Sequence, residues 1–202
     1  MGVKNLFFAG VGGQGLVLSN QLQARAALRA GFDVKTSDVY GLAMRGGSVF
    51  GYNRFGDRVL TSTFAEGTGD VLVGLEPLEA LRYARLLRPG GLAVVSTGRI
   101  FPACVLLGKA LYPDDSVATL RGAGFEVVAI EGLRISREAG NPKMTNLAVL
   151  GALSLHLPEI PEEAYLEALR ELVPEALFEP NRRAFELGRA AGRNEEGPGR
   201  GP

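Results

Sequence analysis

The sequence predicts an α/β protein with a Rossmann-like, mostly parallel sheet, a β-hairpin insertion and a helical C-terminal third. The first observation is a glycine-rich turn that lies between an apolar run, Leu6–Ala9, and a segment of helical periodicity. The second is that further short apolar runs alternate with helical segments as far as residue 130. The third is that the segments after residue 145 all have helical spacing.

The first strand, turn and helix are followed directly by a second strand. In the helix, Leu18, Leu22 and Ala26 recur every four residues with polar side chains between them, and Gly31 ends it. The second strand covers residues 32–37. Residues 4–37 therefore predict one βαβ unit.

The turn itself is a candidate cofactor-binding site. It consists of Gly10, Gly12, Gly13, Gln14 and Gly15, with Val11 between the first two glycines. Glycine allows positive φ and close approach of a ligand or another backbone, and the start of the next helix aims backbone N–H groups at an anion. The alternative is a compact strand-to-helix turn that binds nothing.

The remaining elements follow in chain order. Residues 48–55 and 59–63 flank Gly56-Asp57-Arg58 and predict the hairpin. Later apolar runs predict strands at residues 70–74, 92–96 and 125–130, with helices at 77–87 and 114–122. The helical third consists of residues 145–157, 161–173 and 180–192.

Composition agrees with one globular domain, residues 1–192. The chain has 202 residues, of which 46% are hydrophobic, so it can bury a core. The tail, residues 193–202, has no apolar anchor, and we expect it to be disordered. With 22 basic and 22 acidic residues, nothing points to a nucleic-acid or membrane surface. Neither a signal peptide nor a membrane-spanning stretch is evident, so a cytoplasmic location is expected.

A second glycine-rich segment follows the second strand and contains an arginine. Asp38 lies close to where a dinucleotide-binding fold places an acidic residue for the ribose hydroxyls, and Arg45, Gly46 and Gly47 come soon after it. Beside two glycines, the Arg45 guanidinium can reach a phosphate or carboxylate and bind it through two parallel hydrogen bonds. The alternative is that Arg45 ties down its own loop.

No catalytic residue and no metal site is predicted. His156, the only histidine, ends a helix, where an imidazole usually caps carbonyls or faces solvent. Cys104 is expected to be a small buried apolar residue, and Asp114 and Asp115 to start a helix. One cysteine can neither form an intramolecular disulfide nor supply the usual four ligands of an iron–sulfur cluster.

Two motifs together resemble a known family. G-x-G-G-Q-G, at residues 10–15, occurs with T-S-x-x-x-G-x-x-x-R-G-G-S-V, at residues 36–49. This pair resembles the gamma subunit, or domain, of 2-oxoacid:ferredoxin oxidoreductases, the pyruvate/ketoisovalerate oxidoreductase gamma family. The residues of the two motifs are most similar to those of the beta subunit of indolepyruvate ferredoxin oxidoreductase, which belongs to the same family. Residues 146–153 and 181–188 resemble the family's two late helices, which also occur in other small α/β proteins.

The resemblance implies an accessory subunit of a larger enzyme. In the family, a 2-oxoacid is oxidatively decarboxylated on thiamine diphosphate and Mg²⁺ held by other subunits or domains. Iron–sulfur clusters pass the electrons to ferredoxin, and CoA commonly accepts the acyl group. We therefore expect this chain to be inactive alone and to join thiamine-diphosphate-binding and iron–sulfur subunits in a hetero-oligomer. Its two glycine segments would shape the entrance for substrate or CoA. Whether the acid is of pyruvate, branched-chain or indolepyruvate type is left open.

Two other functions stay open. One is a free-standing Rossmann-type nucleotide-binding protein that uses residues 10–15 and Asp38. The other is a non-catalytic regulatory α/β module whose glycine turn is purely structural. The Arg45 segment favours the oxidoreductase subunit, because a simple dinucleotide enzyme does not require it. For such a subunit, the aromatic and methionine residues of 39–52 are the expected apolar contact with a partner.

Overall fold

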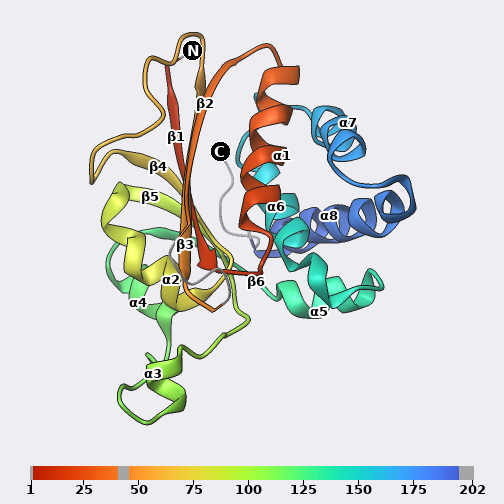
Figure 1. The fold of residues 1–202 in the computed structure, drawn as a ribbon. Helices are drawn as coiled ribbons and strands as arrows, with labels where there is room; N and C mark the ends of the chain where they lie inside the picture. The colour runs from red at the N-terminus through yellow and green to blue at the C-terminus, as the bar shows by residue number, and fades with distance from the viewer. Residues whose placement is uncertain (1, 41–45, 196–202) are drawn as a thin grey trace.

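The computed structural model describes residues 2–40 and 46–195, which form a six-stranded mixed sheet with helices on both faces (Figure 1). The strands are β1 (Lys4–Val11), β2 (Asp33–Tyr40), β3 (Ser48–Gly56), β4 (Gly69–Gly74), β5 (Leu87–Ser96) and β6 (Glu126–Ile130). Their order is β2-β3-β1-β4-β5-β6. The strands β1, β4, β5 and β6 are parallel to one another, and β3 is antiparallel to both β1 and β2. The predicted α/β class is confirmed.

The helices form two layers. They are α1 (Leu16–Arg29), α2 (Pro77–Tyr83), α3 (Ala103–Leu106), α4 (Ser116–Gly122), α5 (Gly132–Glu138), α6 (Thr145–Ser154), α7 (Glu162–Leu172) and α8 (Glu175–Glu195), with 3₁₀ turns at Ala84–Leu86 and Pro142–Met144. Figure 1 shows α1 and α5 to α8 on one side of the sheet and α2 and α4 on the other. The short helix α3 stands apart, below the sheet in this view.

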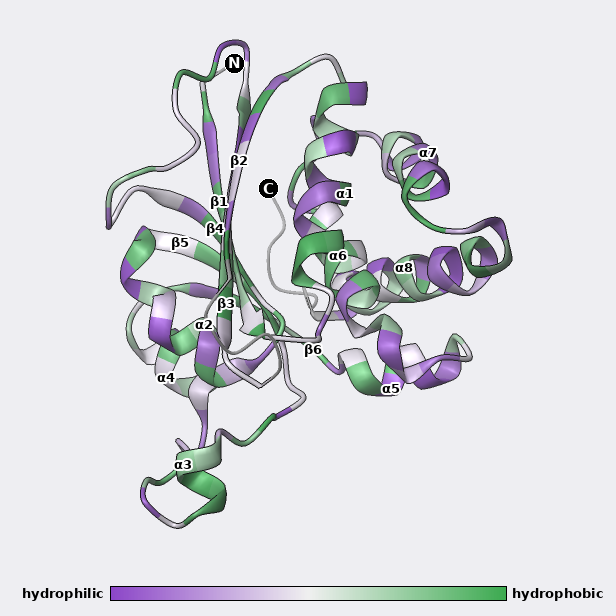
Figure 2. Ribbon diagram, in the orientation of Figure 1, coloured by the Kyte–Doolittle hydropathy of each residue, from purple (hydrophilic) through white to green (hydrophobic). Residues whose placement is uncertain are grey.

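Alternating side chains of the strands build a core on each face. In β1, Leu6 and Phe8 belong to the cluster on the α1, α6 and α8 side, whereas Phe7 and Ala9 belong to the cluster under α2 and α4. Full burial of a leucine or phenylalanine side chain contributes about 1.5–3 kcal/mol. Figure 2 shows α6 as mostly hydrophobic, and every residue from Asn146 to Ser154 is buried.

The predicted hairpin of residues 48–55 and 59–63 is wrong. β3 lies inside the sheet, with β2 on one edge and β1 on the other, so it has no free edge for a strand at 59–63. The segment after β3 turns away instead. Val59 is buried there, and its N–H donates to the Asp33 carboxylate at 2.8 Å. The inserted antiparallel pairing is that of β2 with β3.

The expected βαβ unit is also rearranged. β2 runs in the same direction as β1, but β3 lies between them. In a dinucleotide-binding Rossmann domain the first two strands are neighbours. The cause is the return of the chain after β2, which places β3 between β2 and β1. This non-local pairing leaves no trace in local periodicity.

Two glycines let α6 and α8 cross closely. A Cβ on Gly188 would overlap the carbonyl oxygen of Ala148, and a Cβ on Gly151 would overlap that of Phe185. Both glycines lie in the two late-helix motifs found in the sequence. The glycines therefore set the distance at which these helices pack.

Some helix boundaries differ from those predicted. α8 begins at Glu175 rather than residue 180, keeps Pro180 inside the helix, and continues to Glu195, beyond the expected end at 192. The rest of the expected tail lies outside the described residues. α5 and α3 were not predicted. Among the helices of the described ranges, none combines the length and apolar character needed to cross a membrane.

Candidate functional site

The glycine turn is braced by Gln14. Its Oε1 accepts a hydrogen bond from the Val11 N–H at 2.8 Å, and its Nε2 donates to the Leu75 carbonyl at 2.8 Å. These bonds tie the end of β1 to the segment that follows β4. Gly10 packs beneath the same side chain, since a Cβ there would come within 3.0 Å of Gln14 Oε1. Gln14 and Gly10 are therefore engaged in holding the turn.

Gly13 and Gly15 form the exposed part of the turn. Their φ angles are 101° and 78°, in the region that favours glycine. Gly15 is the N-cap of α1, whose start has no side-chain cap and no acidic residue in its first turn. The helix dipole and the first-turn N–H groups of this 14-residue helix favour an anion beside these two glycines.

The two glycine segments of the sequence meet in the structure. Gly12 N–H donates to the Gly47 carbonyl at 2.8 Å, and Gly46 N–H donates to the Gly12 carbonyl at 3.4 Å. These bonds extend the pairing of β1 with β3 beyond Val11 and Ser48. Gly12 is therefore used in joining the segments. Arg45 and Met44 lie outside the described residues, as does the side chain of Tyr40.

Asn146 belongs to the same region, and sequence reasoning did not identify it as a site residue. It is 3% exposed at the start of α6, and its Nδ2 donates to the Gly15 carbonyl at 3.2 Å. A Cβ on Gly15 would come within 2.9 Å of that nitrogen. The late-helix motif thus packs directly against the glycine turn. The available signal was a polar residue at the start of an otherwise apolar helix.

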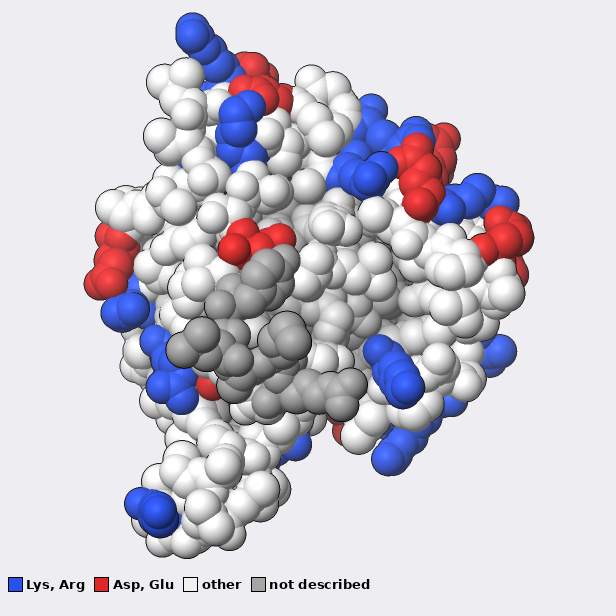
Figure 3. Space-filling model, viewed as in Figure 1, with Lys and Arg blue, Asp and Glu red and all other residues white. Residues whose placement is uncertain are grey.

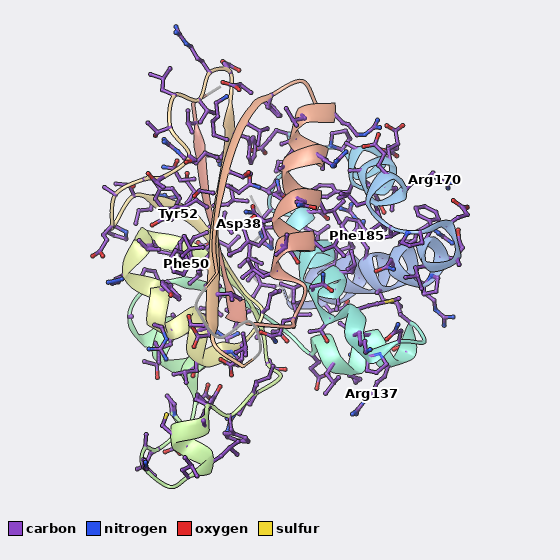
Figure 4. The ribbon with its side chains drawn as sticks, in the orientation of Figure 1. Asp38, Phe50, Tyr52, Arg137, Arg170 and Phe185 are labelled. Atoms are coloured by element: carbon purple, nitrogen blue, oxygen red, sulfur yellow. The ribbon has the colours of Figure 1, made fainter. Side chains whose placement is uncertain are left out.

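Asp38 takes part in a network between elements. Its Oδ1 accepts a hydrogen bond from Asn20 Nδ2 at 2.5 Å, and Asn20 Oδ1 accepts one from Asn53 Nδ2 at 2.8 Å. Figure 4 shows Asp38 on the α1 side of the sheet, with Phe50 and Tyr52 on the other. The carboxylate therefore joins β2 to α1 and β3. This role, together with the position of β2 at the sheet edge, argues against Asp38 as a ribose ligand.

A buried carboxylate lies next to Leu75, the residue that Gln14 contacts. Glu76 is fully buried and accepts hydrogen bonds from the backbone N–H groups of Glu79 at 3.0 Å and Ile100 at 3.2 Å. It also accepts one from the Tyr112 hydroxyl at 2.5 Å. Burial, and then this bond, raise the pKa of Tyr112, so the hydroxyl remains a donor. Glu76 connects the carboxyl edge of the sheet with residues 100 and 112.

A second polar cluster adjoins Gly47. The Ser48 hydroxyl donates to the Glu79 carboxylate and lies 3.2 Å from the Tyr83 hydroxyl. Arg82 Nε donates to Glu79 Oε1 at 3.2 Å. The negative charge of Glu79, which is 4% exposed, is therefore matched by a neighbouring cation.

One hollow lies at the carboxyl ends of β5 and β6. It measures about 320 Å³ and is lined by Thr97, Gly98, Glu131, Leu133, Arg134 and Arg137. Arg134 Nε pairs with Glu131 at 2.7 Å, and Figure 4 shows Arg137 on the same helix, α5. A larger hollow, of about 670 Å³, lies along α8 and away from the glycine turn. Only the smaller one lies at the edge where open α/β sheets bind ligands.

The structure also locates the remaining residues considered in the sequence: Asp115, His156 and Cys104. Asp115 caps α4 by accepting from Ala118 N–H at 2.8 Å, which confirms that expectation. His156 follows the end of α6. Cys104 is exposed on α3, so the expectation of a buried cysteine was wrong. Across residues 2–40 and 46–195, the structure brings no three His, Cys, Asp or Glu side chains together as a metal site.

Comparison with known proteins accounts for nearly the whole chain. The family model described as "Pyruvate ferredoxin/flavodoxin oxidoreductase" matches residues 5–191. The chain belongs to this family. The match includes the glycine turn, Gly46 and Gly47, and both late helices. The resemblance drawn from the sequence motifs is therefore confirmed.

Individual relatives of the family agree. The indolepyruvate oxidoreductase subunit IorB of Thermococcus kodakarensis is 40% identical, with 91% of this chain and 93% of that protein covered. The ketoisovalerate oxidoreductase subunit VorA of Methanothermobacter thermautotrophicus is 29% identical, with 89% of this chain and 34% of that protein covered. The crystal structure of the keto/oxoacid ferredoxin oxidoreductase gamma subunit from Geobacter sulfurreducens matches with a TM-score of 0.71 and 27% identity, covering 95% of this chain and 99% of that one. The chain thus belongs with the accessory subunits of 2-oxoacid:ferredoxin oxidoreductases.

Proposed function

We propose that this chain is the accessory subunit of a thiamine-diphosphate-dependent oxidoreductase of the indolepyruvate type. The observation that carries the proposal is the 40% identity with an indolepyruvate oxidoreductase subunit over 91% of the chain. The subunit supports oxidative decarboxylation of an aryl 2-oxoacid in a cytoplasmic hetero-oligomer and is inactive alone. Pyruvate and branched-chain acids are the competing substrates, and the experiment below separates them.

The catalytic and redox groups of such an enzyme belong on the partner subunits. The donor set of this chain does not fit an iron–sulfur cluster, since Cys104 is its only cysteine. The iron–sulfur clusters are therefore assigned to partner subunits. Thiamine diphosphate with Mg²⁺ is assigned to partner subunits as well, as the family resemblance implies, and ferredoxin is the electron acceptor of the complex. CoA is a further ligand of the complex if the product is an acyl-CoA.

Within this arrangement, the glycine turn is the part of the chain that meets a ligand. Gly13, Gly15 and the first turn of α1 would hold an anionic group, either the carboxylate of the acid or a phosphate of CoA. Gly10 and Gln14 hold the shape of the turn, and Gly12 joins it to Gly46 and Gly47. The sequence places Arg45 directly before Gly46, where its guanidinium would supply the second set of donors.

The test is to purify the affinity-tagged chain from its native host and assay what co-elutes. We expect thiamine diphosphate and iron–sulfur absorbance in the eluate, and dye reduction that is faster with indolepyruvate than with pyruvate or 2-oxoisovalerate. Faster turnover of pyruvate would overturn the indolepyruvate assignment. Elution of the chain without any thiamine-dependent subunit would overturn the accessory role.

A further inference from the structure

One segment of the chain presents apolar side chains that the fold does not bury. Residues 99–115, here called the arm, join β5 to α4 and contain α3, which buries none of its residues. Half of the large hydrophobic side chains that are exposed in the described ranges lie in the arm: Ile100 (39% exposed), Phe101 (46%), Leu106 (72%), Leu107 (69%) and Leu111 (96%). Figures 1 and 3 show the arm as a protrusion below the body with little charge.

The base of the arm is fixed by the buried carboxylate of Glu76. This group accepts from Ile100 N–H, where the arm begins, and from the Tyr112 hydroxyl, where it ends. The Arg99 guanidinium lies over the Tyr112 ring, 5.4 Å from its centroid, and donates to the Asp114 carbonyl at 2.6 Å. Because the base is held before any partner binds, association costs less conformational entropy than it would for a loose loop.

We propose that the arm docks into an apolar groove, with carboxylates at its rim, on the thiamine-diphosphate-binding subunit of the same complex. The arm leaves the carboxyl end of β5, at the sheet edge that also carries the glycine turn. Gln14 contacts Leu75, and the next residue, Glu76, holds the arm. A partner that covers this edge therefore meets both. The charges at the base of the arm, Arg99, Asp114 and Asp115, lie where Arg99 binds the Asp114 carbonyl and Asp115 caps α4. Lys109, between the exposed leucines, is the one charged residue from 100 to 113, and this cation accounts for the acidic rim.

A different subunit is a better occupant than a second copy of this chain. In VorA the matched region makes up 34% of the protein, so there the same domain is joined to a much longer polypeptide. The hollow of about 670 Å³ along α8 of this chain is lined by Ala139, Pro180 and Leu187 together with charged residues, among which Arg182 pairs with both Glu179 and Glu186. The leucines of another copy's arm would have to desolvate these ion pairs to enter it. This inference rests on the proposed accessory role.

Cys104 provides a direct probe, because it is the only cysteine of the chain and is exposed on α3. The chain is treated with a bulky maleimide, alone and in the purified complex, and the Cys104 peptide is measured by mass spectrometry. We expect full labelling of the isolated chain and protection in the complex. The matched control is a Cys104→Ser, Leu60→Cys variant. Leu60 is 77% exposed and lies outside the arm, so its cysteine should be labelled in both states.

A second experiment removes the apolar tip. Leu106→Asp, Leu107→Asp and Leu111→Asp are combined, with Leu60→Asp as the control. All four side chains are exposed, so the melting temperature should not change. We expect the triple variant to bind the partner subunit about thirtyfold more weakly or worse, the loss typical of an interface hot spot. The control should bind as the wild type does.

The outcomes separate the two proposals. Normal assembly of the triple variant, with Cys104 equally reactive in the complex, would overturn the docking role and leave the accessory role intact. A photocrosslinker on Cys104 that joins two copies of this chain within the complex would show that a second copy is the occupant, and would also overturn the inference. Failure of the wild-type chain to recover a thiamine-dependent subunit would overturn both.

Discussion

At the scale of single residues, polar side chains join elements that lie far apart in sequence. Gln14 spans from β1 to Leu75, and Asn146 reaches from α6 to Gly15. Tyr165, fully buried, donates to Gln23 Oε1 at 2.8 Å on the helical side of the sheet. Each satisfies a partner that would otherwise be costly to bury. The contacts of Gln14 and Asn146 brace the glycine turn.

The buried tyrosines give a prediction for alkaline pH. Burial raises the pKa of both Tyr112 and Tyr165 above the ordinary tyrosine value of about 10. A raised folded-state pKa favours the neutral form, so its contribution to stability is complete below about pH 10 and is lost as the pH rises further. In an absorbance titration, Tyr112 and Tyr165 should ionise at higher pH in the folded chain than after unfolding in urea. Tyr112→Phe should remove one of them, and urea unfolding should show lower stability at about pH 11 than at about pH 8. Ionisation of Tyr112 and Tyr165 near pH 10 in the folded chain would contradict this.

Arg45 gives the prediction for the proposed ligand site. In the assembled enzyme, Arg45→Ala should weaken binding of CoA or of the 2-oxoacid by about 1.5–3 kcal/mol, the range for charge-assisted hydrogen bonds. The measurements are Michaelis constants and the melting temperature. Arg58→Ala, in the exposed turn after β3, is the control and should change neither. A lower melting temperature with unchanged Michaelis constants would make Arg45 a structural residue.

At the scale of elements, what the sequence predicts well is what local spacing determines. α1, α4 and α6 follow from helical periodicity and from capping at Gly31 and Asp115, and β1 and β4 from short apolar runs. The position of β3 between β2 and β1 depends on its pairing with β1, from which α1 and β2 separate it in sequence, and no local signal predicts that pairing. The arm was missed for a related reason. A leucine-rich segment is expected in the core, and only the tertiary structure shows that Leu106 and Leu111 are exposed.

The candidate site was predicted in part. The sequence contains both glycine segments, and the structure joins them through Gly12 and Gly47. The contributions of Asn146 and Leu75 were not predicted, because they come from segments that only the fold brings to the turn. Asp38 had the right position in sequence for a ribose ligand. Its actual partner, Asn20, became visible only once α1 was packed on the sheet.

The crossing of α6 and α8 gives a prediction at the scale of elements. Gly188→Ala places a methyl group against the Ala148 carbonyl, so the helices must separate. We expect the free energy of unfolding to fall by about 1–3 kcal/mol, as in other overpacked cores. Gly122→Ala, at the end of α4 with nothing within 4 Å of the new Cβ, is the matched control and should be neutral or slightly stabilising. Equal urea midpoints for both variants would contradict close packing at Gly188.

At the scale of the whole molecule, the helical core and the carboxyl edge of the sheet have different roles. The helices α1 and α5 to α8 form the larger core, and exposed ion pairs between Arg25 and Glu171 and between Arg29 and Glu167 join α1 to α7. Such surface pairs contribute little to stability. The opposite end of the molecule, at the carboxyl edge, holds the glycine turn, the buried Glu76 and the arm. We propose this edge as the surface through which the chain acts in a complex.

The central claim is that the chain is an obligatory but non-catalytic part of a larger oxidoreductase. The most direct measurement is reconstitution: 2-oxoacid-dependent dye reduction by the chain alone, by the thiamine-diphosphate-binding and iron–sulfur subunits without it, and by all of them together, with thiamine diphosphate and Mg²⁺ in each assay. We predict no turnover by the chain alone and full turnover only when it is added back to its partners. Turnover by the purified chain alone, or full activity of the partners in its absence, would contradict the account.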